Sequence, residues 1–290
     1  MAGVIADLPS PFGMNDEIDI VAFGNLCERQ IRAGATALLV GETAGEMATL
    51  TSDEHEALVR TAVEISGGRA KIIAGAGSNS TCQAITLSLR AEAAGADAVM
   101  SVVPYYNKPT QSGIKAHFLT IANATKLPIV LHDNPACCVR VLADETLLEL
   151  SNDIRFIGLR DGSADTTRPL HLRERLPADF KLLSGHDAGV VAYLLHGGDG
   201  SISFTANAVP DLEFEIFEAW KQNEFVYAMT LMDRLKPLSA ALSPEIGPAP
   251  LKYALSLLRL CSSRVRLPMV VPCGQQKAAI TEAMAAALGP

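Results

Sequence analysis

Short apolar runs alternate with amphipathic stretches along most of the chain. Apolar runs of four to eight residues bounded by Gly, Pro and polar residues are typical of buried parallel strands. Eight such runs predict strands at 4–8, 35–40, 71–76, 98–103, 128–132, within the run 155–162 that carries Arg160, at 181–184 and at 200–204.

The stretches between these runs have helical spacing. Thr51 and Glu54 have the spacing of a capping box, and Leu58, Ala62 and Ile65 follow at i, i+4 and i+7. Similar patterns predict helices at 19–33, 81–95, around 114–121, at 144–150, 190–196 and 210–222. This order predicts an α/β fold, a (β/α)8 TIM barrel, over residues 1–224.

The segment 225–290 shows no further strand pattern and predicts helices at 227–242, 251–260 and 275–288. No linker or internal repeat indicates a second independent domain. We therefore expect a C-terminal helical extension of the same domain, packed on the barrel or forming a subunit interface.

Composition narrows the possible partners. The chain has 290 residues, 49% of them hydrophobic and 19% charged, with a formal net charge of −8. This charge argues against nucleic-acid and membrane-surface binding, so a small molecule is the expected partner. No long apolar stretch or basic leader is present, and the six cysteines lack metal or redox spacing. We expect a reduced, cytoplasmic, soluble protein without a metal or other cofactor.

The sixth apolar run ends on Arg160. In barrels of alternating strands and helices the chemistry lies where the strands end, so Arg160 is expected to point into a pocket. A lysine at such a place could condense with a ketone, but a guanidinium stays charged and is a very weak nucleophile. The sequence therefore predicts a reaction other than ordinary lysine-imine chemistry.

Several loops carry a resemblance to a known family, in order and with a strand between each. They are VGETAGEMATL at 40–50, VPYYNKP at 103–109, SGHDA at 184–188, GGDGSIS at 197–203 and RLPM at 266–269. Together they resemble the dihydrodipicolinate synthase / N-acetylneuraminate lyase family. The resemblance implies a barrel that handles pyruvate or another 2-oxoacid, a Schiff-base lysine on strand six, and homo-oligomers built from tight dimers.

The departures from the family pattern fall on the residues expected to do the chemistry. Arg160 stands where the family has its lysine, and His132 stands where strand five ends in a proton-relaying tyrosine. Cys137 stands where the synthases have an arginine for the second substrate's carboxylate. In the carboxylate-binding loop, Glu42, Thr43 and Ala44 take the place of Gly-Thr-Thr.

These comparisons give two groups of candidate site residues. The candidate catalytic residues are Arg160, His132, Tyr106 and Thr43, and the candidate substrate-binding residues are Glu42, Ala44, Cys137, Gly185 and Ile202. Arg160 would hold a carboxylate or stabilise an enolate, and His132 would act as general acid and base. Thr43 and Tyr106 would pass the proton, and the resemblance implies that Tyr106 reaches a neighbouring subunit's site.

Each assignment has a structural alternative. Arg160 could form a buried salt bridge with Asp161 or Glu42, His132 could be a packed core histidine, and Tyr106 could be a packing aromatic. The leading hypothesis is a lyase, an aldolase or a hydratase, that acts on a 2-oxoacid or related small acid without a lysine imine. The alternatives are a non-catalytic ligand-binding or structural paralogue and, more weakly, a metal-dependent aldolase.

Overall fold

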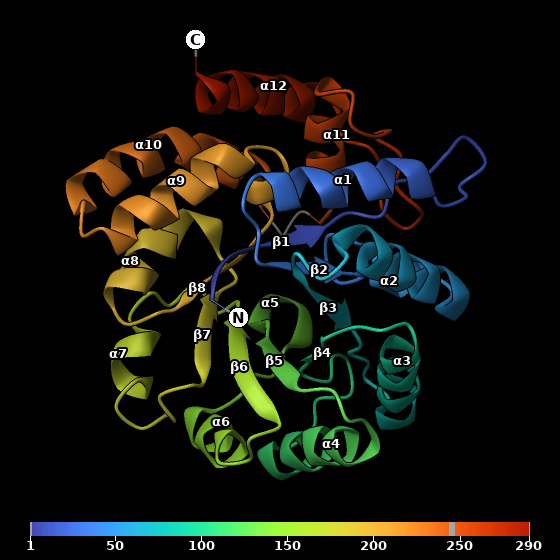
Figure 1. Cartoon of the computed structure of the whole chain (residues 1–290), viewed down its shortest axis with the longest axis vertical. Helices are drawn as coiled ribbons and strands as arrows, with labels where there is room; N and C mark the ends of the chain where they lie inside the picture. The colour runs from blue at the N-terminus through green and yellow to red at the C-terminus, as the bar shows by residue number, and fades with distance from the viewer. Residues whose placement is uncertain (1, 244–246, 290) are drawn as a thin grey trace.

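A computed structural model describes residues 2–243 and 247–289 and forms a closed parallel barrel (Figure 1). Its strands are β1 (Gly3–Leu8), β2 (Ala37–Val40), β3 (Lys71–Gly75), β4 (Ala98–Val102), β5 (Ile129–Asp133), β6 (Phe156–Asp161), β7 (Lys181–Ser184) and β8 (Gly200–Ser203). Each strand pairs with the next, and β8 closes the barrel on β1. The predicted TIM barrel is confirmed.

The strands are surrounded by helices that bury one apolar face. These are α1 (Ile20–Arg32), α2 (Ser52–Ser66), α3 (Thr81–Ala93), α4 (Gln111–Ala124), α6 (Asp144–Ser151), α7 (Arg168–Leu172), α8 (Val190–Leu195) and α9 (Pro210–Lys221). The capping box of Thr51 and Glu54 is present at the start of α2. The sequence did not predict α7 or the single turn α5 (Pro135–Cys138), because both are too short to show helical periodicity.

The inside of the barrel is filled by apolar side chains. This inner core includes Ile5, Leu39, Ile73, Met100, Val130, Leu183 and Ile202. A barrel packed in this way has no central channel, so a ligand site has to lie at one end of the strands.

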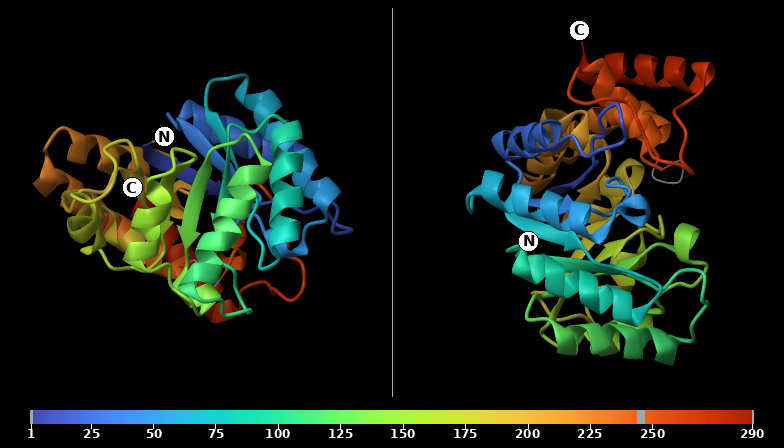
Figure 2. Two further views of the ribbon diagram at one scale, coloured as in Figure 1. Left: turned by 90° about the horizontal axis from the view of Figure 1, so that it is seen from below. Right: turned by 90° about the vertical axis from the view of Figure 1, so that its right-hand side faces the viewer.

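Three further helices follow β8 and α9: α10 (Phe225–Ala241), α11 (Ala249–Leu257) and α12 (Gly274–Leu288). They gather at one side of the barrel, near α9 and α1 (Figures 1 and 2), and their buried apolar side chains belong to the same hydrophobic cluster as the helices around the barrel. That they form one domain with the barrel stays a prediction. Across residues 2–243 and 247–289, no helix is long and apolar enough to cross a membrane.

Candidate active site

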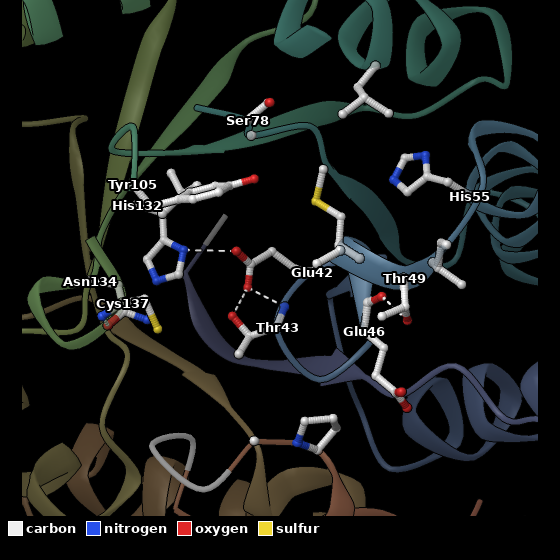
Figure 3. A pocket seen from close by; sticks show the side chains of 18 of the residues that line it. Glu42, Thr43, Glu46, Thr49, His55, Ser78, Tyr105, His132, Asn134 and Cys137 are labelled. Atoms are coloured by element: carbon white, nitrogen blue, oxygen red, sulfur yellow. Dashed lines mark hydrogen bonds and ion pairs between the residues drawn. The ribbon is translucent and has the colours of Figure 1, made fainter. Parts of the chain in front are cut away.

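A cavity of about 600 Å³ opens at the carboxyl ends of β2 to β5 (Figure 3). Its lining comes from the loop after β2, the starts of α2 and α3, the loops after β3, β4 and β5, and the C-terminal segment. The polar side chains at its edge include Glu42, Thr43, Glu46, His55, Ser78, Tyr105, His132 and Asn134. This is the end of the barrel where the chemistry of such folds takes place.

Glu42 is the centre of a hydrogen-bonded network at the edge of this cavity. His132 Nδ1 lies 3.0 Å from Glu42 Oε1. The other oxygen, Oε2, accepts from the backbone N–H of Thr43 at 2.5 Å, from the Thr43 hydroxyl, and from Arg160 Nη1 at 2.8 Å. Figure 3 shows the bonds from His132 and Thr43 meeting on this carboxylate.

Arg160 lies beneath Glu42, inside the end of the barrel. It sits beside His132 in the pairing of β5 and β6, and it is only 2% exposed. Its Nη1 also donates to Asp7 Oδ2 at 3.0 Å, so one nitrogen bridges two buried carboxylates. Arg160 does not line the cavity, because Glu42 stands between them. Arg160 is expected from the sequence to point into a pocket, but it is not among the residues that line this cavity.

The charges of the network are set by burial and by mutual attraction. Burial opposes ionisation of Glu42, but the nearby His132 and Arg160 outweigh it and hold the pKa of Glu42 below its ordinary range. Burial, helped by the charge of Glu42, raises the pKa of Asp7 to about 7, although Arg160 works against it. Burial also opposes the charge on Arg160, but Asp7 and Glu42 raise its pKa overall. Glu42 and Arg160 are thus the charged pair.

The contact with Glu42 orients His132. A carboxylate can only accept hydrogen bonds, so Nδ1 carries the proton and donates to Glu42. The other ring nitrogen points away from Glu42 (Figure 3), and the ring lines the cavity. A titratable ring held by a carboxylate at the edge of a cavity is suited to general acid and base catalysis.

Sequence comparison places the chain in a family. A family model described as "Dihydrodipicolinate synthetase family" matches residues 1–287. The chain belongs to this family. The 4-hydroxy-tetrahydrodipicolinate synthase of Gluconobacter oxydans (strain 621H) is 41% identical over 282 residues, which cover 97% of this chain and 95% of the relative.

Solved structures of the dihydrodipicolinate synthetase family have the same fold. The 4-hydroxy-tetrahydrodipicolinate synthase of Methylacidiphilum fumariolicum SolV superposes with a TM-score of 0.96 at 34% identity, covering 99% of this chain and 96% of that one. The chloride-inhibited enzyme of Acinetobacter baumannii, complexed with pyruvate, gives 0.95 at 32% identity, covering 99% and 98%.

The candidate residues are not all brought to the cavity. Glu42, Thr43, His132 and Cys137 line it, whereas Ala44 is buried outside the lining. Two further candidates lie away from it: Gly185 donates its N–H to Asp161 O at 2.7 Å, and Ile202 is part of the inner core. Tyr106 is 85% exposed and also outside the lining.

Asp161, one of the two partners that the sequence offers Arg160, pairs with Arg168 instead. Arg168 Nη1 donates to Asp133 Oδ2 at 2.8 Å and to Asp161 Oδ1 at 3.2 Å. These two aspartates follow His132 and Arg160 directly in β5 and β6. Arg168 therefore ties together the ends of the two strands that carry the network, a role that the sequence did not indicate.

Asp7 is the network residue that sequence reasoning missed. It lies on β1, is fully buried, and meets an arginine 153 residues away. The available signal was an acidic residue inside an otherwise apolar run, which requires a buried partner.

Neither lysine nor arginine occurs among the described residues that line the cavity, and no group of three or more His, Cys, Asp or Glu in that part of the chain is placed to hold a metal.

Proposed function

We propose that this chain is a lyase of the dihydrodipicolinate synthetase family, of the aldolase or hydratase type, that uses no lysine imine. Its substrate would be a 2-oxoacid or a related small carboxylic acid. The pairing of His132 with Glu42 at the edge of the cavity carries the proposal, because it provides an oriented acid and base where a ligand would bind. The pyruvate complex of the Acinetobacter baumannii relative supports this class of ligand.

The absence of a suitable amine argues for chemistry without an imine. Arg160 stands where the resemblance puts the lysine, and a guanidinium does not form an iminium with a ketone. Lys252 is fully buried and pairs with Glu46, and no lysine belongs to the described lining of the cavity. The reaction would therefore depend on proton transfer and electrostatic stabilisation.

His132 would move the proton in such a reaction. In the direction of aldol cleavage, the imidazole removes the proton of a hydroxyl group. The bond between the hydroxyl-bearing carbon and the carbon next to the carbonyl group then breaks, and its electrons form the enolate. The products are an aldehyde and the enolate of the 2-oxoacid, which takes the proton back on carbon from His132. The carboxylate that accepts from Nδ1 of His132, which is Glu42 in this structure, stabilises the imidazolium, and the charge of Arg160 favours the anionic enolate.

Exchange of the C3 protons of pyruvate in deuterium oxide, followed by proton NMR, tests this proposal. Wild-type protein should accelerate the exchange above the rate in buffer. His132→Asn should lower the protein-catalysed rate by about 100-fold or more, since general base catalysis is typically worth that much. His171→Asn, which changes an exposed histidine, is the matched control. Equal rates for His132→Asn and wild type would exclude His132 as the base.

We also propose a homo-oligomer, at least a dimer, in which Tyr106 reaches the cavity of a neighbouring chain. Tyr106 is held at φ 68° in the loop after β4 and projects from its own chain, with 85% of its surface exposed. Val139 and Val141, in the loop after β5, are also exposed, at 63% and 50%. Exposed aromatic and aliphatic side chains of this kind favour a protein interface.

A further inference from the structure

The groups around Glu42 form a binding site for a carboxylate, and a carboxylate of the protein fills it. The donors are the imidazole of His132, the backbone N–H and hydroxyl of Thr43, and the guanidinium of Arg160. A cation, an N–H and a hydroxyl converging on one point are the donors that an organic acid needs. Glu42 therefore occupies the place where the carboxylate of an acid in the cavity would find the best set of hydrogen-bond donors.

The two carboxylates on Arg160 differ in their access to the cavity. Asp7 is fully buried and does not line it, whereas Glu42 does. Both accept from the same nitrogen, Nη1. If the side chain of Glu42 turned into the cavity, Arg160 would still donate to Asp7. The carboxylate of the ligand would replace the charge of Glu42, so the buried cation would not be left unpaired.

We propose that Glu42 is a displaceable internal carboxylate that determines how the cavity binds acids. The carboxylate of the ligand takes the place of Glu42 on Arg160, Thr43 and His132, and Arg160 keeps its hydrogen bond to Asp7 throughout. The inference rests on the proposed function, because it describes how the acid of that function is held.

Displacement couples ligand binding to a proton. The charged and titratable groups that face Glu42 are Asp7 from β1, His132 from β5, Arg160 from β6 and the buried thiol of Cys138 after β5; Asp187 in turn acts on Arg160. After displacement, the carboxyl group of Glu42 lies in the cavity, away from the cations that keep its pKa low. Burial there favours its protonated form. Binding of one carboxylate therefore takes up one proton, and affinity should rise up to about tenfold for each unit by which the pH falls.

Calorimetric titration with pyruvate tests the displacement. Glu42→Ala leaves the donors open and should bind pyruvate at least about tenfold more tightly than wild type, because truncating a competitor for a buried charge has effects of that size or larger. Glu42→Gln keeps the volume but loses the charge, so its affinity should be intermediate. Glu145→Gln removes the same charge from an exposed ion pair with Arg175 and should bind like wild type.

The second measurement is proton uptake. Titration of wild type in two buffers with different ionisation enthalpies should show uptake of about one proton per pyruvate bound, and Glu42→Ala should show much less. Folding of each variant is checked by its thermal melting curve, and Glu42→Gln is the variant that preserves packing.

The outcomes separate this inference from the proposed function. If wild type binds pyruvate but neither Glu42 variant binds it more tightly, or if wild type takes up no proton, the acid binds elsewhere and the displacement is wrong. If Glu42→Ala binds tightly while wild type catalyses no C3 exchange, the displacement stands and the proposed reaction fails. If no variant binds pyruvate, both are overturned.

Discussion

The side chain of Lys252 ends on the carboxylate of Glu46, 206 residues earlier in the chain. Lys252 lies on α11 and is fully buried, with its ammonium group 3.8 Å from the centre of the Phe12 ring. Glu46 lines the cavity, and its second oxygen accepts from the backbone N–H of Arg266 at 3.0 Å. The ion pair thus joins the C-terminal segment to the loop that carries Glu42.

Breaking this pair should destabilise the fold. Burial lowers the pKa of Lys252 although Glu46 opposes the shift, so the lysine depends on its partner to stay charged. Lys252→Met should lower the free energy of unfolding by about 3–5 kcal/mol, because Glu46 becomes an unpaired buried charge. Urea denaturation measures this change.

The controls for this pair are a second pair and a double variant. Lys236→Met removes a lysine that pairs with Asp233 on the surface, and should change stability by less than about 1 kcal/mol. Combining Lys252→Met with Glu46→Gln should recover part of the loss. If Lys252→Met is as stable as Lys236→Met, the buried pair does not hold the segment in place.

Much of the fold was predictable because it depends on local pattern. Each strand is a short apolar run bounded by Gly, Pro or polar residues, and the start of α2 is encoded by Thr51 and Glu54 within one turn. The helices that escaped prediction, α5 and α7, have four and five residues and therefore no period to detect. Local sequence was sufficient wherever an element was long enough to bury a face.

The site was predictable only in part because its decisive contacts are long-range. The family resemblance, together with a position at or just after a strand end, was enough to place His132 and Thr43 on the cavity. The partners of Arg160 lie 153 and 118 residues away, and no local pattern shows that Glu42 would cover it. The outward direction of Tyr106 likewise depends on a left-handed backbone conformation, which the local sequence does not predict.

Wild-type protein mixed with pyruvate and borohydride should gain no covalent mass, since no lysine in the described part of the chain lines the cavity where an iminium would form. If the pocket admits a 2-oxoacid, Arg160→Lys should be trapped on residue 160, because pyruvate that displaces Glu42 reaches the new amine. Trapping should be slow at neutral pH, because Asp7 and Glu42 would keep the new amine protonated, and faster at alkaline pH. Intact-mass spectrometry and peptide mapping detect the adduct, and Arg160→Met is the control without an amine. An adduct on any lysine of the wild type would show that the imine chemistry persists.

The chain should be a poor 4-hydroxy-tetrahydrodipicolinate synthase. The resemblance puts Cys137 where an arginine holds the second substrate's carboxylate, and Cys137 lines the cavity. Loss of a charge-assisted contact of that kind costs about 2–5 kcal/mol, or roughly 30- to several-thousand-fold in affinity. A coupled assay with pyruvate and aspartate semialdehyde measures the activity, with a synthase relative as positive control. Turnover equal to that of the relative would refute the prediction.

Light scattering at micromolar concentration should show a dimer or a larger homo-oligomer. Tyr106→Arg should weaken it, because a charge would replace an aromatic group that we expect to be buried against the neighbouring chain. Val226→Arg is a matched control on α10, where the native side chain is 84% exposed. A purely monomeric wild type, or equal dissociation of both variants, would contradict the placement of Tyr106 at the interface.

The buried carboxyl group of Glu213 should make the free energy of unfolding depend on pH. Glu213 lies on α9, is 2% exposed, and accepts from the hydroxyl groups of Ser203, at 3.0 Å, and Thr205. Asp187 bonds to the same Thr205 hydroxyl at 2.9 Å. Burial, together with the charge of Asp187, raises the pKa of Glu213 from 4.5 to about 8. At neutral pH this carboxyl group is therefore protonated in the folded protein and ionised in the unfolded chain.

Because the folded state holds the extra proton, the free energy of unfolding should fall as the pH rises from about 4.5 to about 8, with a slope of up to about 1.4 kcal/mol per pH unit. Asp7, whose pKa is also raised, acts in the same direction up to about pH 7. Glu213→Gln mimics the protonated group and cannot ionise, so it should flatten the profile and be more stable than wild type at the alkaline end. Urea denaturation across this pH range measures the slope, and Glu145→Gln on the surface should leave it unchanged. Parallel profiles for wild type and Glu213→Gln would show that the pKa of Glu213 is not raised in the folded protein.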